Sequence, residues 1–566
     1  MVRKSIQRGD RSSLSISISN TAIVQVDEKT GQILSATNSN GSEYEQFNEH
    51  TLERGLKSRH VQLIAIGGAI GTGLFVGSSL ILTTCGPGSL FLSYCVMSTL
   101  IYFVMQMMAE MTTYLPLPGN GPQAFVNDFL STSFGFTVGY NYWYTFSILV
   151  AAEITAAAIV IEYWIKSVNV SVWITIFFFI IFGLNMISVA FFGEAEFWFA
   201  SIKLITLSGL IILGVVLFFG GGPNHDRLGF RYWKEGAFLE LPEVSGDGGK
   251  FLGFWWALVR SGFAFICSPE LVSTSAGECA APRRNLPKAA RRFIWRLVFF
   301  YVCGTLIIGV IVSARDPRLL SALGGEDASG SAFVIGIQNA GIPVLNHIIN
   351  AAILTSAASA GNSFLYSASR ALFSIAHRGN APKFLLKVNR FGVPYYCVLI
   401  SSLFGLLAYL NAGEGSSNVF SWFMNICTIS GFISWIMVGF AYLRWRKAIF
   451  FQGLWDRVPY KTIFQPYGTY YMITMIGLLT LTNGFRVFFE FNIGDFLASY
   501  VTFPILLALY FGHRFYEYKV NGVKHWVVPI EKIDVITGLD LIEEEEANYP
   551  PRVPRNFAER VWFWVA

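Results

Sequence analysis

Long apolar stretches separated by short polar breaks fill the chain from residue 61 to residue 514. About 20 apolar residues in an α-helix cross the hydrocarbon core of a bilayer, which is about 30 Å thick. Stretches of that length recur about twelve times. We therefore predict an all-α membrane protein with spans near residues 61–84, 88–113, 134–165, 172–192, 196–220, 252–275, 293–314, 344–375, 394–411, 418–443, 469–489 and 494–514.

The composition agrees with helices embedded in lipid. Of the 566 residues, 53% are hydrophobic and only 14% are charged, a balance that water-soluble chains do not have. Aromatic residues make up 16%, and this share suits lipid-facing helices better than the alternating strands of an outer-membrane barrel. The net charge of +5 is spread over the connections between spans, so nucleic acid is not an expected partner.

The distribution of Lys and Arg over alternate connections predicts the orientation of the chain, because basic residues gather on the cytosolic side. One set of connections is strongly basic, with Arg283, Arg284, Lys288, Arg291, Arg292, Arg378, Lys383, Lys387, Arg390, Arg444, Arg446, Lys447, Arg457 and Lys461. On the opposite side, one connection holds Arg315 and Arg318, and residues 412–418 and 488–499 contain neither Lys nor Arg. The basic set, together with both termini, is therefore predicted to be cytosolic.

The two ends of the chain are predicted to be tails. Residues 1–58 are rich in Ser, Thr, Asn and charged residues and lack the pattern of a signal peptide, so they are predicted to form a disordered cytosolic tail. Residues 59–516 form the predicted transmembrane domain, and residues 517–566 form a C-terminal cytosolic tail. The acidic run from Glu543 to Glu546 is interpreted as solvated chain rather than as a docking element.

Patterns typical of enzymes are absent from the sequence. All seven cysteines lie in or beside apolar segments without a CxxC pair, so neither disulfides nor a zinc site are predicted. No metal-ligand cluster occurs, and no nucleophile stands at motif spacing from a base. We therefore expect no catalytic residues and no metal. No phosphate-binding G-x-x-x-x-G-K-[ST] motif occurs, so the chain has no ATP site of this kind. Any transport of a solute against its concentration gradient would therefore use an ion gradient.

Glycines interrupt the first span at Gly67, Gly68, Gly71 and Gly73. Glycine destabilises a helix interior by roughly 1 kcal/mol relative to alanine, so a local break is expected. Such a break exposes backbone N–H groups, and the half-helix after it directs its positive end toward them, which suits a carboxylate ligand. Close helix packing through small residues is the alternative explanation.

Pro269 predicts a matching break in the sixth span, because proline lacks an N–H and clashes with the carbonyl four residues earlier. Carbonyls freed there would accept hydrogen bonds from an ammonium group. The residues before it that follow helical spacing are expected on one helix face: Arg260, Phe263, Ala264 and Cys267. In the alternative interpretation, Phe263 faces lipid and Arg260 extends to the outer surface.

Charged residues inside predicted spans are further candidates. Glu153 lies deep in the third span, where a charge costs about 2.5–3.5 kcal/mol, so it is expected to accept an amine or carry a proton. The alternative is a protonated Glu153 that bonds to a neighbouring helix. Lys203 follows Glu194 and Glu196 by about two turns and either reaches the bundle interior or extends to the cytosolic boundary. The small residues from Thr355 to Gly361 are expected to serve helix packing.

The chain resembles the fungal amino-acid permeases of the amino acid/polyamine/organocation superfamily from about Arg54 to Leu541. The segment GAIGTGLF from Gly68 to Phe75 is similar to the first-span signature of that family, and EAEFWFASIK from Glu194 to Lys203 is similar to its fifth-span signature. Other segments most resemble the proline permeases: FAFICSPELV at residues 263–272, AGECA at 276–280 and FVIGIQNAG at 333–341.

The resemblance implies a LeuT-like core of two five-helix inverted repeats plus two further helices, with broken first and sixth spans. It also implies roles for particular residues. Residues 71–73 would hold a substrate carboxylate, Phe263 would act as a gate, and Lys203 with Glu153 would couple transport to protons. The full set of expected substrate-binding residues is Gly71, Thr72, Gly73, Glu153, Arg260, Phe263, Ile266 and Ser268.

The function implied by the resemblance is import of proline, or a similar small neutral amino acid, across the plasma membrane by proton symport with alternating access. The proton is the coupling ion, no cofactor is expected, and the tails are expected to contact trafficking or ubiquitination machinery. Arg260 stands where proline carriers usually have Lys, which leaves γ-aminobutyrate and other neutral amino acids as alternative substrates. A non-transporting amino-acid receptor on the same scaffold is a further alternative.

Overall fold

The structure is a computed structural model. It describes short strands between residues 6 and 44, and then residues 71–116, 121–165, 167–187, 189–274, 282–323, 331–414, 416–548 and 556. The long helices are α2 (Ser78–Tyr114), α4 (Thr132–Ile161), α5 (Val170–Met186), α6 (Val189–Phe218), α8 (Asp247–Ser261), α10 (Pro282–Ile311), α13 (Leu345–His377), α16 (Ser416–Phe451), α17 (Tyr467–Leu481) and α19 (Thr502–Val520).

Shorter elements complete the bundle and its connections. They are η1 (Gly73–Gly77), α3 (Pro122–Phe129), α7 (Arg231–Lys234), η2 (Gly262–Phe265), α9 (Ser268–Thr274), α11 (Pro317–Leu323), α12 (Ala332–Asn339), η4 (Lys383–Leu386), α14 (Tyr395–Leu403), η5 (Phe404–Leu410), α15 (Asn411–Glu414), η6 (Trp455–Arg457), η7 (Phe485–Phe488), α18 (Ile493–Tyr500), η8 (Ile530–Lys532) and α20 (Leu539–Asn548).

The membrane domain is all-helical, as the sequence predicts. Within the described residues, nine helices are long and apolar enough to cross a membrane, and α18 with α19, bent by 42°, would make ten. The predicted number of about twelve spans is not confirmed and stays a prediction. Helix α5, with 17 residues, falls short of the length that the other spans have.

A kink joins the first two predicted spans, where the sequence predicts a polar connection. Gly86 adopts φ 85°, which glycine tolerates without strain, and Pro87 follows it. An added Cβ on Gly86 would lie 2.8 Å from the carbonyl oxygen of Ala237, which accepts a hydrogen bond of 2.7 Å from the N–H of Gly88. The segment before α8 therefore packs directly onto this kink.

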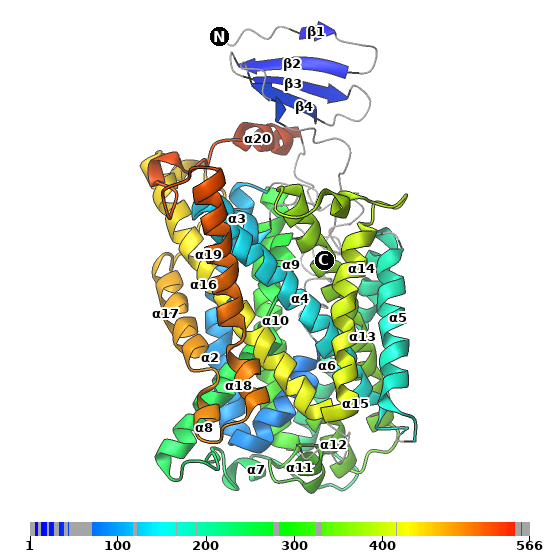
Figure 1. Cartoon of the computed structure of the whole chain (residues 1–566). Coiled ribbons are helices and arrows are strands. Elements are labelled where there is room, and N and C mark those ends of the chain that lie inside the picture. The colour runs from blue at the N-terminus through cyan, green and yellow to red at the C-terminus, as the bar shows by residue number, and fades with distance from the viewer. Residues whose placement is uncertain are drawn as a thin grey trace.

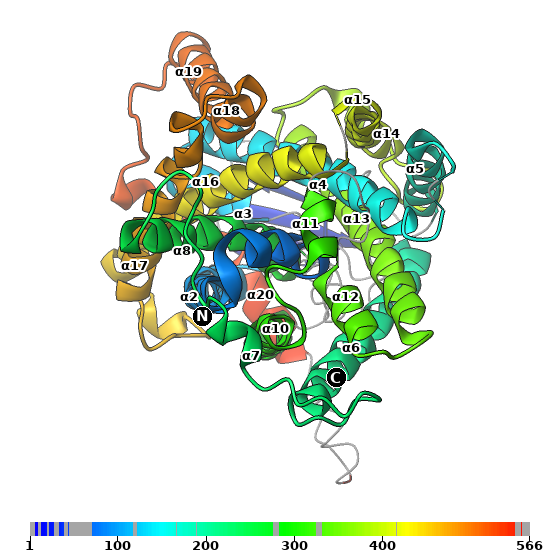
Figure 2. The ribbon, with the colours of Figure 1, turned by 90° about the horizontal axis from the view of Figure 1, so that it is seen from below.

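Helix α4 lies at the centre of the bundle and packs against α13 and α16, whereas α2 packs against α8 and α10. Figure 2 shows α5, α14 and α15 at one edge and α18 with α19 at another. The peripheral helices expose apolar side chains. On α6, Trp198, Ile205 and Ile212 are all exposed and are spaced seven residues apart, so they form a single outward stripe. That stripe is the face expected toward lipid.

The N-terminal segment contains strands where the sequence predicts a disordered tail. The strands β1 (Ile6–Arg8), β2 (Ser13–Ser19), β3 (Ala22–Asp27), β4 (Ile33–Asn38) and β5 (Glu43–Tyr44) pair in sequence order, and the registered pairs are antiparallel. β2 reads SLSISIS, an alternation of polar and apolar residues with the period of a strand, which an argument from composition overlooks. The predicted boundary at residue 58 lies outside the described residues.

The C-terminal tail is docked on the helices, which corrects its interpretation as solvated chain. Ile533, Val535 and Leu539 are buried in the main core, and the hydroxyl of Tyr114 donates a 2.9 Å hydrogen bond to the carbonyl of Val535. Figure 1 shows α20 lying across the end of the bundle that also carries the N-terminal strands.

Ion pairs hold the acidic helix α20 in place. Arg457 lies 2.7 Å from carboxylate oxygens of both Asp540 and Glu543, and Arg283 lies 3.5 Å from Glu543 and 3.7 Å from Glu546. The acidic run was misinterpreted because its basic partners come from segments far away in the sequence.

We expect Glu543→Gln to loosen the tail more than Asp540→Asn does, because Glu543 contacts both arginines and Asp540 contacts only Arg457. Hydrogen–deuterium exchange of residues 530–548 measures the difference, with an expected acceleration of up to about fivefold for partly exposed ion pairs. Unchanged exchange in Glu543→Gln would contradict a docking role for the ion pairs.

The hydrogen bond from Arg457 holds the pKa of Glu543 below its usual value of 4.5. A lowered pKa in the docked state means that the ionised carboxylate favours docking above about pH 4.5 and ceases to do so as the pH falls through the lowered pKa. Docking is therefore expected to be constant at neutral pH and to weaken only in acid.

Candidate functional site

The described part of the first span begins at its predicted break. Gly71 is a bend, Thr72 precedes η1, and η1 is a π-helix from Gly73 to Gly77. Residues 67–70 lie outside the described residues, so the break is seen from its C-terminal side alone. A single π-helical turn widens the helix locally and is frequent at functional sites. Every residue of this turn is buried.

The sixth span is broken, but not where the sequence predicts. Helix α8 ends at Ser261, the tighter turn η2 follows, and the chain is extended at Ile266 before Cys267 adopts φ 62°. Pro269 is the second residue of α9, where its missing N–H has no helical partner to lose. The break therefore precedes Pro269, and the proline starts the second half-helix instead of interrupting a continuous one.

This break also changes the predicted common face of Arg260, Phe263, Ala264 and Cys267. Arg260 lies on the α-helix, Phe263 and Ala264 lie on the tighter turn, and Cys267 lies beyond it. Since a common face requires one continuous helical period, that prediction is wrong for this segment.

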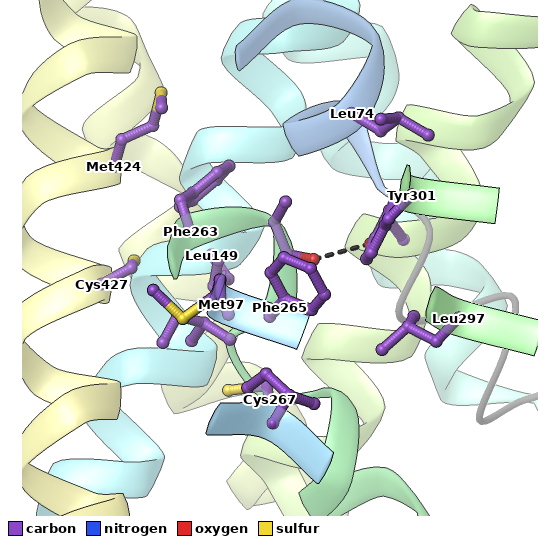
Figure 3. Packing of buried hydrophobic residues seen from close by; sticks show 14 of the residues in the cluster. Leu74, Met97, Leu149, Phe263, Phe265, Cys267, Leu297, Tyr301, Met424 and Cys427 are labelled. Carbon is purple, nitrogen blue, oxygen red and sulfur yellow. Dashed lines mark hydrogen bonds between the residues drawn. The ribbon is translucent and has the colours of Figure 1, made fainter. Parts of the chain in front are cut away.

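The two breaks pack directly against each other. A Cβ added to Gly73 would lie 2.7 Å from the Cα of Ala264 and 3.3 Å from its nitrogen, so only glycine allows this contact. Figure 3 shows Leu74, next to Gly73, on the same side of the cluster as Tyr301, with Phe265 of η2 beside Tyr301 and Phe263 on the opposite side. The backbone groups of both interrupted spans are therefore brought to one place in the bundle interior.

Tyrosines hydrogen-bond two carbonyls at the breaks. The hydroxyl of Tyr94 donates to the carbonyl of Gly73 at 3.3 Å, and the hydroxyl of Tyr301 donates to that of Ala264 at 2.7 Å (Figure 3 draws the second). Their rings lie 5.9 Å apart, and each lies against Phe265. The carbonyl of Ala264 thus already accepts a hydrogen bond from Tyr301. Fewer free carbonyls at this break therefore remain to bind a substrate ammonium. Neither tyrosine lies in a motif or pattern that would have predicted this role.

Glu153 points its carboxylate at the first break. Its Oε1 accepts a long hydrogen bond of 3.4 Å from the N–H of Thr72, and a Cβ on Gly71 would meet the same oxygen at 2.6 Å. Its other oxygen, Oε2, is buried and has no hydrogen-bond partner among the described residues. Glu153 therefore occupies the N–H side of the break, which is where the sequence predicts a substrate carboxylate.

Lys203 lies inside the bundle and not at its boundary, with only 1% of its surface exposed. The charges of Glu196 and Glu153 both act on it. Glu196, fully buried, lies on the same helix seven residues earlier, so it shares the face of Lys203. Sequence reasoning named Glu196 only as a neighbour, although the seven-residue spacing was a usable signal.

The small residues of α13 do more than allow packing. A Cβ on Gly361 would lie 3.4 Å from the Cβ of Glu153, so this helix approaches the carboxylate closely. Ser359 donates a 2.7 Å hydrogen bond to Oε1 of Glu196. Helices α4, α6 and α13 therefore build one buried polar cluster, Glu153–Lys203–Glu196–Ser359, which reaches the first break through Thr72.

The remaining predicted residues are distributed around the sixth-span break. Arg260 donates to the carbonyl of Ser421 at 3.3 Å and lies 5.0 Å from the ring centre of Trp256, so contacts with α8 and α16 hold it. Phe263 stands edge-on to Phe420 of α16, with ring centres 5.8 Å apart.

Ile266 and Ser268 lie on either side of Cys267. A Cβ on Gly431 would meet the Cδ1 of Ile266 at 2.4 Å, so this side chain packs closely on α16. The hydroxyl of Ser268 is buried without a hydrogen-bond partner among the described residues. Because a buried polar atom is costly when unpaired, it is available to a polar ligand.

A separate cavity of about 600 Å³ lies beside the segment that connects α7 to α8. It contains no residue of either break, and its lining is Thr83, Thr84, Gly236, Phe238, Leu239, Glu240, Pro242, Arg315 and Arg486. The buried polar groups at the breaks make them the better candidate site.

The sequence from residue 60 to residue 520 matches the family model described as amino acid permease. The chain belongs to this family. The permease is 52% identical over 525 residues to the proline-specific permease of Emericella nidulans, covering 92% of this chain and 94% of that protein. It is 55% identical over 503 residues to a probable proline-specific permease of Schizosaccharomyces pombe, covering 88% and 90%. The resemblance to fungal proline permeases is thereby confirmed.

The fold of the permease is also found in solved structures. A crystal structure of a mutant manganese transporter from Eremococcus coleocola matches with a TM-score of 0.54 at 15% identity, covering 81% of this chain and 93% of that one. At this identity the likeness concerns the fold alone. The predicted LeuT-like class of the permease is confirmed, and its function in amino-acid transport rests on the family and on the fungal relatives.

Proposed function

We propose that the permease imports proline, or a similar small neutral amino acid, across the plasma membrane by proton symport with alternating access, and that both termini are cytosolic. The observation that carries the proposal is the contact between the two breaks beside a buried glutamate and lysine. The high identity to permeases named proline-specific supports the choice of substrate.

Residues 71–73 supply the N–H groups of the first break, and these suit the substrate carboxylate because the half-helix behind them directs its positive end there. Ser268 offers an unpaired hydroxyl at the second break. Proline is a zwitterion with a small apolar ring, and Phe263 with Phe420 provides an apolar wall from the side of α16.

Competition between two carboxylates would couple the substrate to the proton. Glu153 bonds to the N–H of Thr72, so a substrate carboxylate that arrives there meets a like charge. The repulsion ends when Glu153 accepts a proton or turns toward Lys203. In this mechanism the permease binds proline tightly only with a proton, and the charge of Lys203 attracts the carboxylate of Glu153 when the site is empty.

The membrane potential is sufficient for such a cycle. One charge moved through 100 mV yields about 2.3 kcal/mol, and about 1.4 kcal/mol corresponds to a tenfold concentration ratio. One proton per proline would therefore sustain roughly fiftyfold accumulation. No cofactor is required in this scheme, and the tails are proposed to contact trafficking or ubiquitination machinery.

Uptake by purified permease in proteoliposomes tests the proposal. Radiolabelled proline is expected to accumulate when the outside is acidic and the inside is negative, and collapse of both gradients by a protonophore should abolish accumulation. Competition by γ-aminobutyrate, alanine and glycine at two pH values defines the substrate. Proline accumulation that is unchanged by the protonophore would contradict proton symport. Proline binding without any uptake would favour the non-transporting receptor.

A further inference from the structure

Two arginines from distant parts of the sequence share the ring of one tryptophan. The guanidinium carbon of Arg260 on α8 lies 5.0 Å from the ring centre of Trp256, and that of Arg486 on η7 lies 5.4 Å from the same ring. Trp256 is only 5% exposed. A cation this close to an indole ring is attracted to its π-electrons, more strongly where water is excluded. Trp256 therefore brings two like charges together just before the sixth-span break, which begins at Gly262.

A carboxylate fixes Arg486 from the predicted outer side. Nε and Nη2 of Arg486 donate to Oε1 of Glu243 at 2.9 Å and 2.5 Å. Glu243 belongs to the segment that connects α7 to α8, and its side chain is 10% exposed. Arg486 also lines the cavity of about 600 Å³ beside that segment. Because the ion pair is partly buried and uses two donors, it restrains Arg486 over the ring more firmly than an exposed pair would.

Arg260 has no comparable partner. Its guanidinium donates a 3.3 Å hydrogen bond to the carbonyl of Ser421, and no carboxylate of the described residues forms an ion pair with it. The charged and titratable groups that act on it from other elements are Arg486, Asp495 and Cys85. Because a charge buried without a counter-ion is costly, Arg260 is suited to bind an anionic group of a ligand.

Trp455, at the predicted cytosolic side, provides a contrast, because it also contacts two cations. Arg446 and Lys461 lie 4.3 Å and 5.1 Å from its ring centre. Arg446, however, lies 3.6 Å from the buried carboxylate of Glu110, which neutralises it. These contacts are sufficient to explain that stack as structural. In the stack before the sixth-span break, the cation nearer to the break is the one without a counter-ion.

We propose that Arg486 is a positioning residue of the permease, which through the shared ring of Trp256 holds Arg260 ready for the carboxylate of an amino acid that enters from outside. This inference rests on the proposed import of a zwitterionic amino acid. Like charges repel, so Arg486, restrained by Glu243, disfavours an outward turn of Arg260 along the ring. The guanidinium of Arg260 thus stays at the edge of the break, where the carboxylate arrives before it reaches the N–H groups of residues 71–73.

A double-mutant cycle on initial rates of proline uptake in proteoliposomes tests the proposal. Arg486→Gln removes the charge and the ring contact. We expect it to raise the KM for proline about threefold to tenfold, the effect of one cation–π contact, and to keep the maximal rate within about twofold. Arg260→Met should raise the KM at least as much. The double variant should show no further rise, because Arg486 acts through Arg260 and additivity fails for residues coupled in this way.

Three further variants make the result specific. Arg486→Lys keeps the charge and should keep the KM within about twofold of wild type. Glu243→Gln leaves Arg486 charged but unrestrained, so it should raise the KM in the wild-type background and not in Arg260→Met. It also replaces Arg486→Gln in the cycle if that variant does not fold. Arg315→Gln removes a charge that lines the same cavity but is not part of the stack, and it should leave the KM unchanged.

A KM for proline that is unchanged in both Arg486→Gln and Glu243→Gln would overturn the proposal. So would increases in KM that multiply when Arg486→Gln is combined with Arg260→Met, or an increase of the same size in Arg315→Gln. A wild-type permease that takes up no proline would instead refute the proposed function, and that result is obtained without any variant.

Discussion

Replacing Gly73 with valine is expected to abolish proline uptake while leaving the permease folded in the membrane. The added side chain would start 2.7 Å from the Cα of Ala264, a backbone atom that cannot turn away. The two breaks would have to separate, and overpacking of this kind costs about 1–3 kcal/mol. Since about 1.4 kcal/mol is tenfold in binding, the affinity for proline should fall about fivefold to 140-fold. Binding of labelled proline to purified protein measures the loss.

Two other glycines provide controls for this result. The Cβ of Gly71→Ala would approach the carboxylate of Glu153 at 2.6 Å, the end of a side chain that can rotate, and would make an ordinary contact of 3.5 Å with Ala360, so a smaller loss of affinity is expected. Gly477→Val on α17 has no atom within 4 Å of the added Cβ and should leave uptake unchanged. Equal affinity for proline in Gly73→Val and wild type would show that the contact between the breaks does not form the site.

Replacing Lys203 with methionine is expected to eliminate proton-driven accumulation and to lower thermal stability. Glu153 and Glu196 would remain buried without their cation, and removal of one partner from a buried pair costs about 3–5 kcal/mol. Uptake against a gradient and the melting temperature of the purified permease measure the two effects separately.

A second substitution separates coupling from stability in this cluster. Lys203→Met combined with Glu196→Gln removes one charge of each sign and should recover most of the thermal stability without recovering accumulation. Glu153→Gln should lose accumulation as well, because the amide cannot exchange a proton, while the protein still reaches the cell surface. Normal accumulation in both Glu153→Gln and the double variant would remove this cluster from the coupling mechanism.

The membrane class and the approximate spans were predictable because burial in lipid is encoded in local hydrophobicity. The glycine-rich break was visible for the same reason, since glycine weakens a helix wherever it stands. The break in the sixth span was assigned to Pro269, whereas the chain leaves the helix before it. Gly262 explains part of this difference, because a Cβ there would meet Cζ of Phe432 at 2.4 Å. A contact with a distant helix cannot be deduced from one segment.

The buried polar partners were the least predictable part of the site. Glu153 and Lys203 stood out as charges in apolar spans, but their proximity depends on how α4 and α6 pack. Tyr94 and Tyr301 donate hydrogen bonds to carbonyls on other helices. Nothing in their own segments of sequence predicts these contacts. The docked tail shows the same limit, because Arg283 and Arg457 precede α20 by long stretches of sequence.

The structure of the permease with proline, determined by cryo-electron microscopy in lipid nanodiscs, tests the central claim most directly. We expect proline between residues 71–73 and residues 264–268, with its carboxylate on the backbone N–H groups of the first break and Glu153 displaced from Thr72. Proline bound instead in the cavity lined by Arg315 and Arg486, with Glu153 still bonded to Thr72, would contradict the account.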